Sequence, residues 1–203
     1  TYDGSELILN GKASWVYMEE IIGRSENYKA FWWSPEGSYI AFLKFDDKPV
    51  MEYTLTNGFS PEPKQNKETQ RYPFPGTPNP GVKLCIFNFS SNKYHVIDDN
   101  SEKDVYIAFP FFKPDDKKLY YQKLNRGQDT LQIIEYDTEN YKKRKIYSET
   151  RKDWVNFIER IHFVSNGFIL RNDKSGWSHF YHYDWNGTLV NQITHGNWNA
   201  ENI

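Results

Sequence analysis

Hydrophobic and polar positions alternate along this chain over short stretches, and polar turns separate the stretches. Residues 31–42 hold an aromatic stretch, a Ser-Pro-Glu-Gly turn and a second hydrophobic stretch. Residues 109–121 repeat this pattern around Pro-Asp, and residues 161–170 repeat it around Asn-Gly. A period of two is typical of β-strands, and Asn-Gly is a strong signal for a hairpin turn. The pattern therefore predicts three β-hairpins.

A second pattern follows each predicted hairpin. A hydrophobic strand ends at Asn88, Asp137 or Asp184, and a polar turn and a short closing strand come next. These three residues are 49 and 47 positions apart (137 − 88 and 184 − 137). Such a period is typical of four-stranded propeller blades. The two patterns together predict an all-β fold, a partial β-propeller of about three four-stranded antiparallel blades.

Two insertions enlarge the first predicted blade. One spans about residues 12–28 and contains Glu19 and Glu20 between the apolar run Trp15-Val16-Tyr17 and Gly23. Because a helical turn takes about 3.6 residues and glycine can end a helix, this segment predicts a short helix that presents both carboxylates. The other insertion spans about residues 45–84 and contains seven prolines. Proline is excluded from central strands, so we expect an extended arm with a strand pair around residues 51–55 and a return through Arg71.

Composition and charge narrow the function classes. A chain of 203 residues can bury a sizeable core, and its 18% aromatic content favours strands. The net charge of −2 predicts no nucleic-acid partner, and no apolar stretch has the roughly 18 residues of a membrane span. The single cysteine, Cys85, has hydrophobic neighbours and is expected in a buried strand. Stabilisation by intrachain disulfides is therefore excluded.

The two ends of the chain match in phase. Residues 1–4 resemble residues 194–197, which follow the last predicted closing strand, and the first residue is Thr1 rather than Met. We therefore expect residues 1–203 to be a fragment of a longer protein that begins and ends just after a blade.

Four groups of residues resemble the N-terminal propeller domain of the dipeptidyl peptidase IV family. They are residues 15–20, residues 31–37, residues 72–84 and the blade turns. The order and spacing of the first three groups are specific, and the resemblance covers the whole chain. The family motif often has three consecutive acidic residues; here Met18 replaces the first, and Glu19 and Glu20 match the other two.

The resemblance implies a parent enzyme, a serine exopeptidase of bacterial type that releases N-terminal dipeptides with Pro or Ala second. Glu19 and Glu20 would bind the α-ammonium group of the peptide substrate. The chemistry is sensible because two carboxylates form charge-assisted hydrogen bonds to a cation with three donors. The implied partners are a C-terminal α/β-hydrolase domain of the same protein and a second copy in a homodimer. No cofactor is implied, and the implied location is the periplasm or cell envelope.

Other candidate chemistry is weaker. No Gly-x-Ser-x-Gly motif occurs, so the chain is expected to hold no catalytic residues of its own. His179 and His182 would point to opposite faces of a strand, which argues against a metal site. Two glycosylation sequons begin at Asn88 and Asn186, where turn residues are expected anyway. Three tryptophans could stack on a sugar, namely Trp177, Trp185 and Trp198. The alternative function is thus a propeller-type module that binds protein or glycan without peptidase activity.

Overall fold

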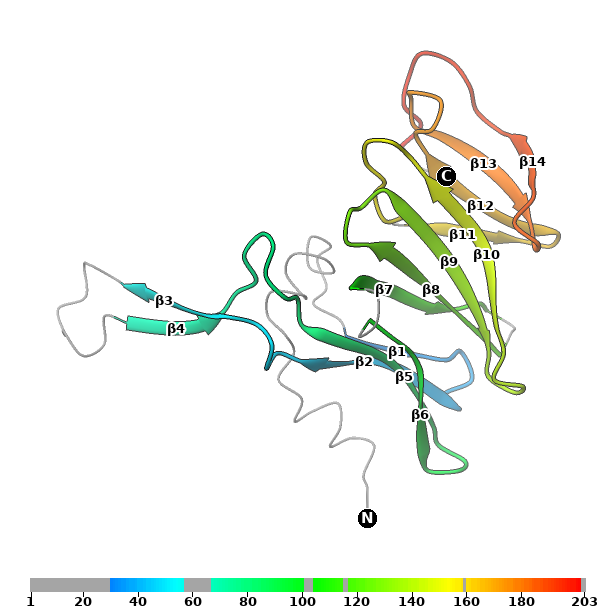
Figure 1. Cartoon of the computed structure of the whole chain (residues 1–203). Coiled ribbons are helices and arrows are strands. Elements are labelled where there is room, and N and C mark those ends of the chain that lie inside the picture. The colour runs from blue at the N-terminus through cyan, green and yellow to red at the C-terminus, as the bar shows by residue number, and fades with distance from the viewer. Residues whose placement is uncertain (1–29, 57–66, 101–103, 115–116, 159, 202–203) are drawn as a thin grey trace. The chain divides into compact units, whose positions relative to one another are not determined.

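The computed structural model describes residues 30–56, 67–100, 104–114, 117–158 and 160–201 (Figure 1). These ranges form three four-stranded sheets and one two-stranded sheet, and they contain no helix. The predicted all-β class is therefore confirmed. The chain divides into two compact units, Thr1–Ile107 and Ala108–Ile203, and the division falls within strand β7.

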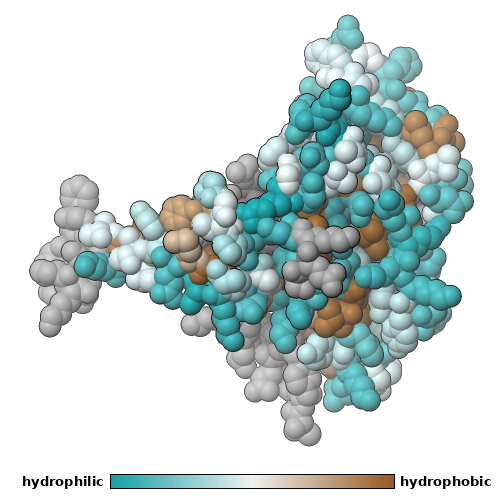
Figure 2. All heavy atoms as spheres, in the orientation of Figure 1, coloured by the Kyte–Doolittle hydropathy of each residue, from teal (hydrophilic) through white to brown (hydrophobic). Residues whose placement is uncertain are grey.

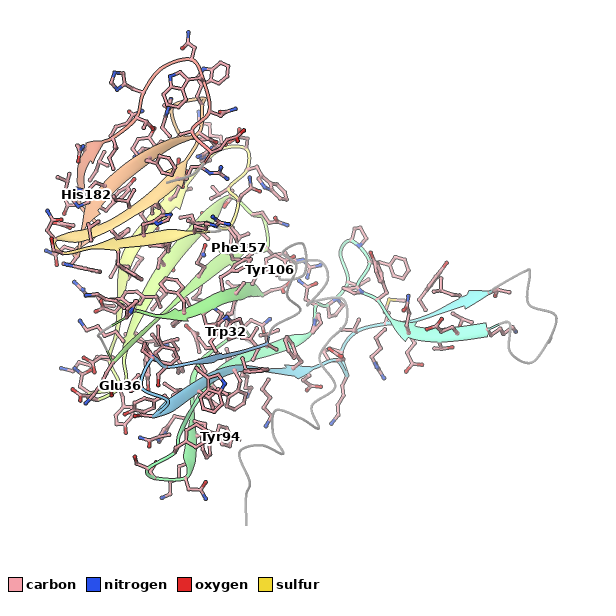
Figure 3. All side chains as sticks on the ribbon, turned by 180° about the vertical axis from the view of Figure 1, so that it is seen from behind. Trp32, Glu36, Tyr94, Tyr106, Phe157 and His182 are labelled. Carbon is pink, nitrogen blue, oxygen red and sulfur yellow. The ribbon has the colours of Figure 1, made fainter. Side chains whose placement is uncertain are left out.

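The first sheet belongs to the first unit and has the strand order β1-β2-β5-β6. Its strands are β1 (Phe31–Trp33), β2 (Tyr39–Asp46), β5 (Gly81–Asn88) and β6 (Lys93–Asp99). Figure 3 labels Trp32 on β1 and Glu36 in the turn that follows. This turn closes through a hydrogen bond of 3.0 Å from the Gly37 amide to the Ser34 carbonyl, with a φ of 70° at Gly37. A positive φ favours glycine, which explains the predicted Ser-Pro-Glu-Gly turn.

A hairpin inserted between β2 and β5 forms the arm. It pairs β3 (Glu52–Thr56) with β4 (Lys67–Arg71), and it projects away from the first sheet (Figure 1). The predicted strand pair is thus confirmed. At its base, Arg71 donates from Nη1 to the Val50 carbonyl at 2.8 Å and from Nη2 to the Glu52 carboxylate at 2.9 Å. Figure 2 shows hydrophobic residues on the surface of the arm, where Met51 and Leu55 are exposed.

The second and third sheets repeat the four-stranded pattern. The second has the order β10-β9-β8-β7, with β7 (Val105–Phe112), β8 (Lys118–Asn125), β9 (Thr130–Asp137) and β10 (Lys143–Thr150). The third has the order β11-β12-β13-β14, with β11 (Ile161–Val164), β12 (Gly167–Asn172), β13 (His179–Asp184) and β14 (Leu189–Gln192). Both are antiparallel meanders, as the two sequence patterns predict.

An Asn or Asp that accepts the amides of the following turn ends the third strand of each four-stranded sheet. The Oδ1 atoms of Asn88, Asp137 and Asp184 each accept two backbone N–H groups of the turn that follows. The donors are Ser90 and Ser91 for Asn88, Glu139 and Asn140 for Asp137, and Asn186 and Thr188 for Asp184, all at 2.8–3.2 Å. Asn and Asp side chains favour such turns because their oxygen satisfies the backbone amides. This chemistry explains why the spacing of these residues predicts the repeat.

Aromatic packing joins the second sheet to the third within the second unit. The Tyr120 ring lies 5.3 Å from the Phe163 ring, and Phe163 stacks on Trp185 at 5.8 Å. The backbones also approach closely, because a Cβ atom at Gly187 would lie 1.8 Å from the Ile146 carbonyl oxygen. Only glycine fits there, so the sequence at the β13–β14 turn is adapted to this contact.

Candidate functional site

The predicted substrate-binding residues, Glu19 and Glu20, lie outside the described residues, as does the whole segment 12–28. The predicted helix and the role of the two carboxylates therefore stay predictions. What the structure describes is the chain that follows them and the loops that connect the blades.

The segment that returns from the arm is fixed by two asparagines. The Asn79 amide donates to Asp104 Oδ1 at 3.2 Å, across the chain between β6 and β7. Asn100 is buried, receives the Val82 amide at 2.7 Å and donates to the Pro80 carbonyl at 3.1 Å. Asn100 thus satisfies the backbone carbonyl of Pro80 and the backbone amide of Val82, and Asn79 ties the segment to Asp104. The proline-rich segment thus has a defined path into β5.

Hydrogen bonds to β8 and to the β8–β9 turn fix the loop between β10 and β11. Its backbone donates from Val155 to the Gln128 carbonyl at 2.8 Å. The Gln122 side chain pairs with Ile158 in both directions, with Nε2 donating to the carbonyl at 2.7 Å and Oε1 accepting the amide at 2.8 Å. Phe157, labelled in Figure 3, packs edge-on against Phe109 with 5.3 Å between ring centroids. The loop is therefore rigidly positioned.

The same loop presents one exposed aromatic side chain. Trp154 is 49% exposed, and its Nε1 donates to Asn156 Oδ1 at 2.8 Å. The structure thus offers an oriented indole there without assigning it a ligand.

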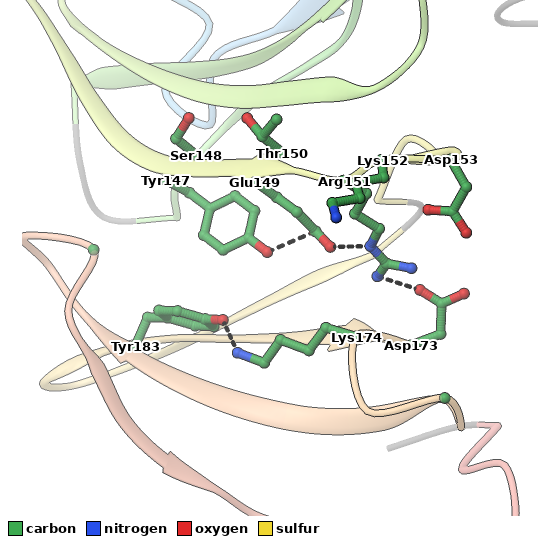
Figure 4. A pocket seen from close by; sticks show the side chains of 12 residues that line it. Tyr147, Ser148, Glu149, Thr150, Arg151, Lys152, Asp153, Asp173, Lys174 and Tyr183 are labelled. Carbon is green, nitrogen blue, oxygen red and sulfur yellow. Dashed lines mark hydrogen bonds and ion pairs between the residues drawn. The ribbon is translucent and has the colours of Figure 1, made fainter.

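A polar cluster centred on Glu149 lies between β10 and the third sheet (Figure 4). The Glu149 side chain is 9% exposed and accepts the Tyr147 hydroxyl at 2.8 Å and Arg151 Nε at 2.6 Å. It also accepts the Asn172 amide, and Arg151 Nη2 donates to Asp173 at 2.5 Å. Glu149 is thus a buried carboxylate whose hydrogen bonds are satisfied, as buried charges require.

The protonation of this cluster follows from its surroundings. Burial raises the pKa of Tyr147 far above its ordinary value, and the nearby Tyr183 and Glu149 raise it further. Burial acts to lower the pKa of Arg151, but hydrogen bonds to Asp173 and Glu149 outweigh it and the net pKa is raised. Tyr147 therefore stays a neutral donor and Arg151 stays a cation.

A pocket of about 780 Å³ opens beside this cluster (Figure 4). It is lined by β10, the start of the β10–β11 loop, strand β13 and the β12–β13 and β13–β14 turns. The lining residues are Tyr147–Asp153, Asp173, Lys174, Gly176, Tyr183 and Gly187. Lys174 Nζ donates to the Tyr183 hydroxyl at 2.8 Å and lies 4.1 Å from the centre of the Tyr181 ring.

The structure describes the two histidines that the sequence offered as a weak candidate metal site. His179 is buried and bonds through its ring nitrogens to Thr194 and Gly196, whereas His182 lies three residues on along β13 (Figure 3). No three His, Cys, Asp or Glu side chains gather as a metal site in the part of the chain that the structure describes. Within the same ranges no helix has the length and hydrophobicity of a membrane span.

The remaining candidates serve the fold. Cys85 is buried, and burial raises the pKa of its thiol to about 11, so it is not a reactive thiolate. Trp185 stacks inside the aromatic packing between the sheets, while Trp177 and Trp198 are exposed. The three tryptophans therefore do not form one exposed sugar-stacking surface.

Sequence reasoning missed the Glu149 cluster. A signal was present, because Tyr147 and Glu149 alternate along β10 and share one face, and Arg151 continues the same alternation just after the strand ends. Their partners, Asn172 and Asp173, come from another blade, and their proximity depends on how the two sheets pack. The pairing of Gln122 with Ile158, 36 residues apart, depends on tertiary structure in the same way.

Comparison with known proteins decides the family. The family described as "Dipeptidyl peptidase IV (DPP IV) N-terminal region" matches residues 1–203, the entire chain. The chain belongs to this family. The resemblance that the Trp-Val-Tyr, Phe-Trp-Trp and proline-rich segments indicated is thus confirmed.

Individual proteins that are similar to the chain carry dipeptidyl peptidase names, which agrees with the family assignment. The chain is 29% identical to dipeptidyl peptidase 4 of Trichophyton rubrum over 98% of its length, which covers 27% of that protein. It is 27% identical to dipeptidyl aminopeptidase B of Saccharomyces cerevisiae, over 26% of that protein. The crystal structure of Porphyromonas gingivalis dipeptidyl peptidase 4 matches with a TM-score of 0.80 and 27% identity, over 94% of this chain and 27% of that one. The fold is therefore a partial propeller, and the chain spans about a quarter of the length of these relatives.

Proposed function

We propose that this chain is the substrate-selecting, non-catalytic propeller portion of a serine exopeptidase that releases dipeptides from free N-termini. The observation that carries the proposal is the family match over residues 1–203, a range that includes Glu19 and Glu20, which the sequence resemblance assigns to the family's acidic motif. Relatives that match nearly the whole chain are named dipeptidyl peptidases.

In this proposal the two carboxylates bind the α-ammonium group of the peptide and act as a ruler. Charge-assisted hydrogen bonds from the ammonium fix the first residue of the substrate. Because the first residue is fixed, only the second peptide bond reaches the nucleophile of the hydrolase domain. The preference for Pro or Ala at the second position is proposed on the family resemblance.

The proposed partners are the α/β-hydrolase domain of the same protein and a second copy that contacts the arm. The exposed apolar side chains of Met51, Tyr53 and Leu55 support the second contact, since a purely solvated hairpin favours polar residues. The periplasmic or cell-envelope location stays a prediction.

Peptide digestion by the full-length protein tests the proposal. Mass spectrometry of a peptide with Pro at positions 2 and 4 should show stepwise loss of two dipeptides, and an active-site fluorophosphonate should label one serine and abolish the release. If the protein released no dipeptide and the probe labelled no serine, the proposal would be wrong. The alternative, a propeller module that only binds protein or glycan, would then be favoured.

A further inference from the structure

We propose that the pocket beside Glu149 binds a small organic anion, with the ligand's carboxylate on Lys174. This inference does not rest on the proposed peptidase function, since it concerns only the packing of β10 against the third sheet. The pocket's volume of about 780 Å³ lies within the range of roughly 300–1,000 Å³ that is usual for small-molecule sites.

The charged side chains of the pocket differ in how many hydrogen-bond and ion-pair partners they have. Glu149 has three donors, from Tyr147, Arg151 and Asn172, so it has little capacity for a further cation. Arg151 is paired with both Glu149 and Asp173. Lys174 differs, because the only hydrogen bond of its ammonium group is to the neutral hydroxyl of Tyr183. Two cations line the pocket without a carboxylate partner among the described residues: Lys152, which is exposed, and Lys174, whose ammonium group is held by neutral groups and keeps two of its three N–H donors available.

The Lys174 ammonium group is also held in position. Its nitrogen lies 4.1 Å from the Tyr181 ring centre and 5.3 Å from the Tyr183 ring centre, within the range of cation–π interactions. Figure 4 shows its side chain extending along the pocket, with the nitrogen at Tyr183 and away from Asp173. A cation fixed by neutral groups binds an anion with little further loss of side-chain entropy.

The walls favour an organic anion over an inorganic one. The Tyr147 and Tyr183 rings meet edge-on at 5.2 Å, and both residues line the pocket together with Gly187. An aromatic or aliphatic body can therefore pack against these rings while its carboxylate accepts from Lys174. Aromatic rings beside a fixed ammonium group offer a ligand both a packing surface and an orienting charge, as small-molecule sites do.

Three probes with the same ring test the proposal: benzoate, neutral benzamide and cationic benzylamine. Calorimetric titration of the full-length protein should show benzoate binding at least about tenfold more tightly than the other two, because a charge-assisted hydrogen bond is stronger than a neutral one. Lys174→Met should weaken benzoate binding by at least about tenfold, and Lys174→Arg should retain most of it. Lys142→Met, which removes an exposed lysine from the β9–β10 turn, is the matched control and should change nothing.

Retained thermal unfolding temperatures would show that the variants are folded. Equal binding of benzylamine and benzoate would overturn the proposal, as would benzoate affinity that is unchanged in Lys174→Met. Absence of any benzoate binding up to tens of millimolar in the folded wild type would overturn it as well.

Discussion

The side-chain amide of Gln122 and the backbone of Ile158 form a reciprocal pair, with hydrogen bonds of 2.7 and 2.8 Å. Gln122 is 1% exposed, and Ile158 is also buried. The pair imitates one rung of a β-ladder and fixes the loop that carries Trp154 and Phe157 to strand β8. A buried backbone amide and carbonyl find their partners in a single side chain.

This pairing predicts a large and specific loss of stability. Gln122→Leu keeps the volume but leaves the amide and carbonyl of Ile158 unpaired, which should cost about 2–4 kcal/mol of unfolding free energy. The same substitution at Gln192, whose side chain makes an exposed hydrogen bond to the Thr194 carbonyl, should cost about 0.5 kcal/mol or less. Urea denaturation of the two variants measures the difference. Equal losses would show that the reciprocal pair adds nothing to stability.

Two ion pairs of similar length should contribute differently to the free energy of unfolding. Glu149 lies 2.6 Å from Arg151 and is 9% exposed, whereas Glu139 lies 2.7 Å from Lys117 and is 64% exposed. Glu149→Gln places an amide group among the donors of Tyr147, Arg151 and Asn172 and should cost about 2–4 kcal/mol. Glu139→Gln should cost less than about 1 kcal/mol, because exposed pairs are screened by water. Thermal and urea unfolding measure both, and similar costs would contradict the burial argument.

The turn carboxylates predict a dependence of stability on pH. Backbone amides lower the pKa of Asp184, chiefly the amide of Thr188, and those of Asn140 and Glu139 lower that of Asp137. A lowered folded-state pKa stabilises the protein above the unfolded value of 3.8, and the contribution is lost as pH falls through the folded value. Asn88 accepts two turn amides at the corresponding strand end without charge, so Asp184→Asn is a conservative probe.

The measurement is the difference in unfolding free energy between wild type and Asp184→Asn across pH 2 to 7. The part that depends on charge should be constant above about pH 5 and shrink as the pH falls below the ordinary value for aspartate. A difference that grows on acidification would contradict the assigned direction of the pKa shift.

Removal of the arm should weaken the proposed homodimer. Replacing residues 52–71 of the full-length protein by a short Gly-Ser linker removes β3 and β4, and it should shift the protein toward monomer in analytical ultracentrifugation. Met51→Ser with Leu55→Ser, which keeps the hairpin but removes two exposed apolar side chains, should shift it in the same direction. A dimer of unchanged stability in both variants would show that the arm does not hold the copies together.

The repeat could be predicted because its determinants are local. Gly37 adopts a positive φ, Asn166-Gly167 closes a hairpin, and Asn88, Asp137 and Asp184 bind the amides of their own turns. Each of these interactions lies within about five residues of sequence, where residue type nearly determines geometry. The strand pair of the arm was predicted on different grounds, because the prolines of residues 45–84 exclude that segment from the central strands of the blade.

Contacts between blades could not be predicted in this way. Arg151 meets Asp173, and Gly187 meets Ile146, only after two sheets have packed with a defined offset. The sequence carries hints, such as the shared face of Tyr147, Glu149 and Arg151, but no local rule names their partners. Glu19 and Glu20 could be singled out only because a whole family motif surrounds them.

The central claim is that Glu19 and Glu20 bind the substrate's α-ammonium, and cleavage of one dipeptide anilide with a free or an acetylated N-terminus tests it most directly. In the full-length protein, Glu19→Gln or Glu20→Gln should each lower kcat/KM for the free substrate by roughly 10- to 100-fold, since a charge-assisted hydrogen bond is worth about 1.5–3 kcal/mol. The slow cleavage of the acetylated substrate should not change, so the preference for a free amine should collapse. Glu36→Gln, in the exposed β1–β2 turn, should leave both rates as they are. An undiminished preference for the free amine in both Glu19→Gln and Glu20→Gln would contradict the claim.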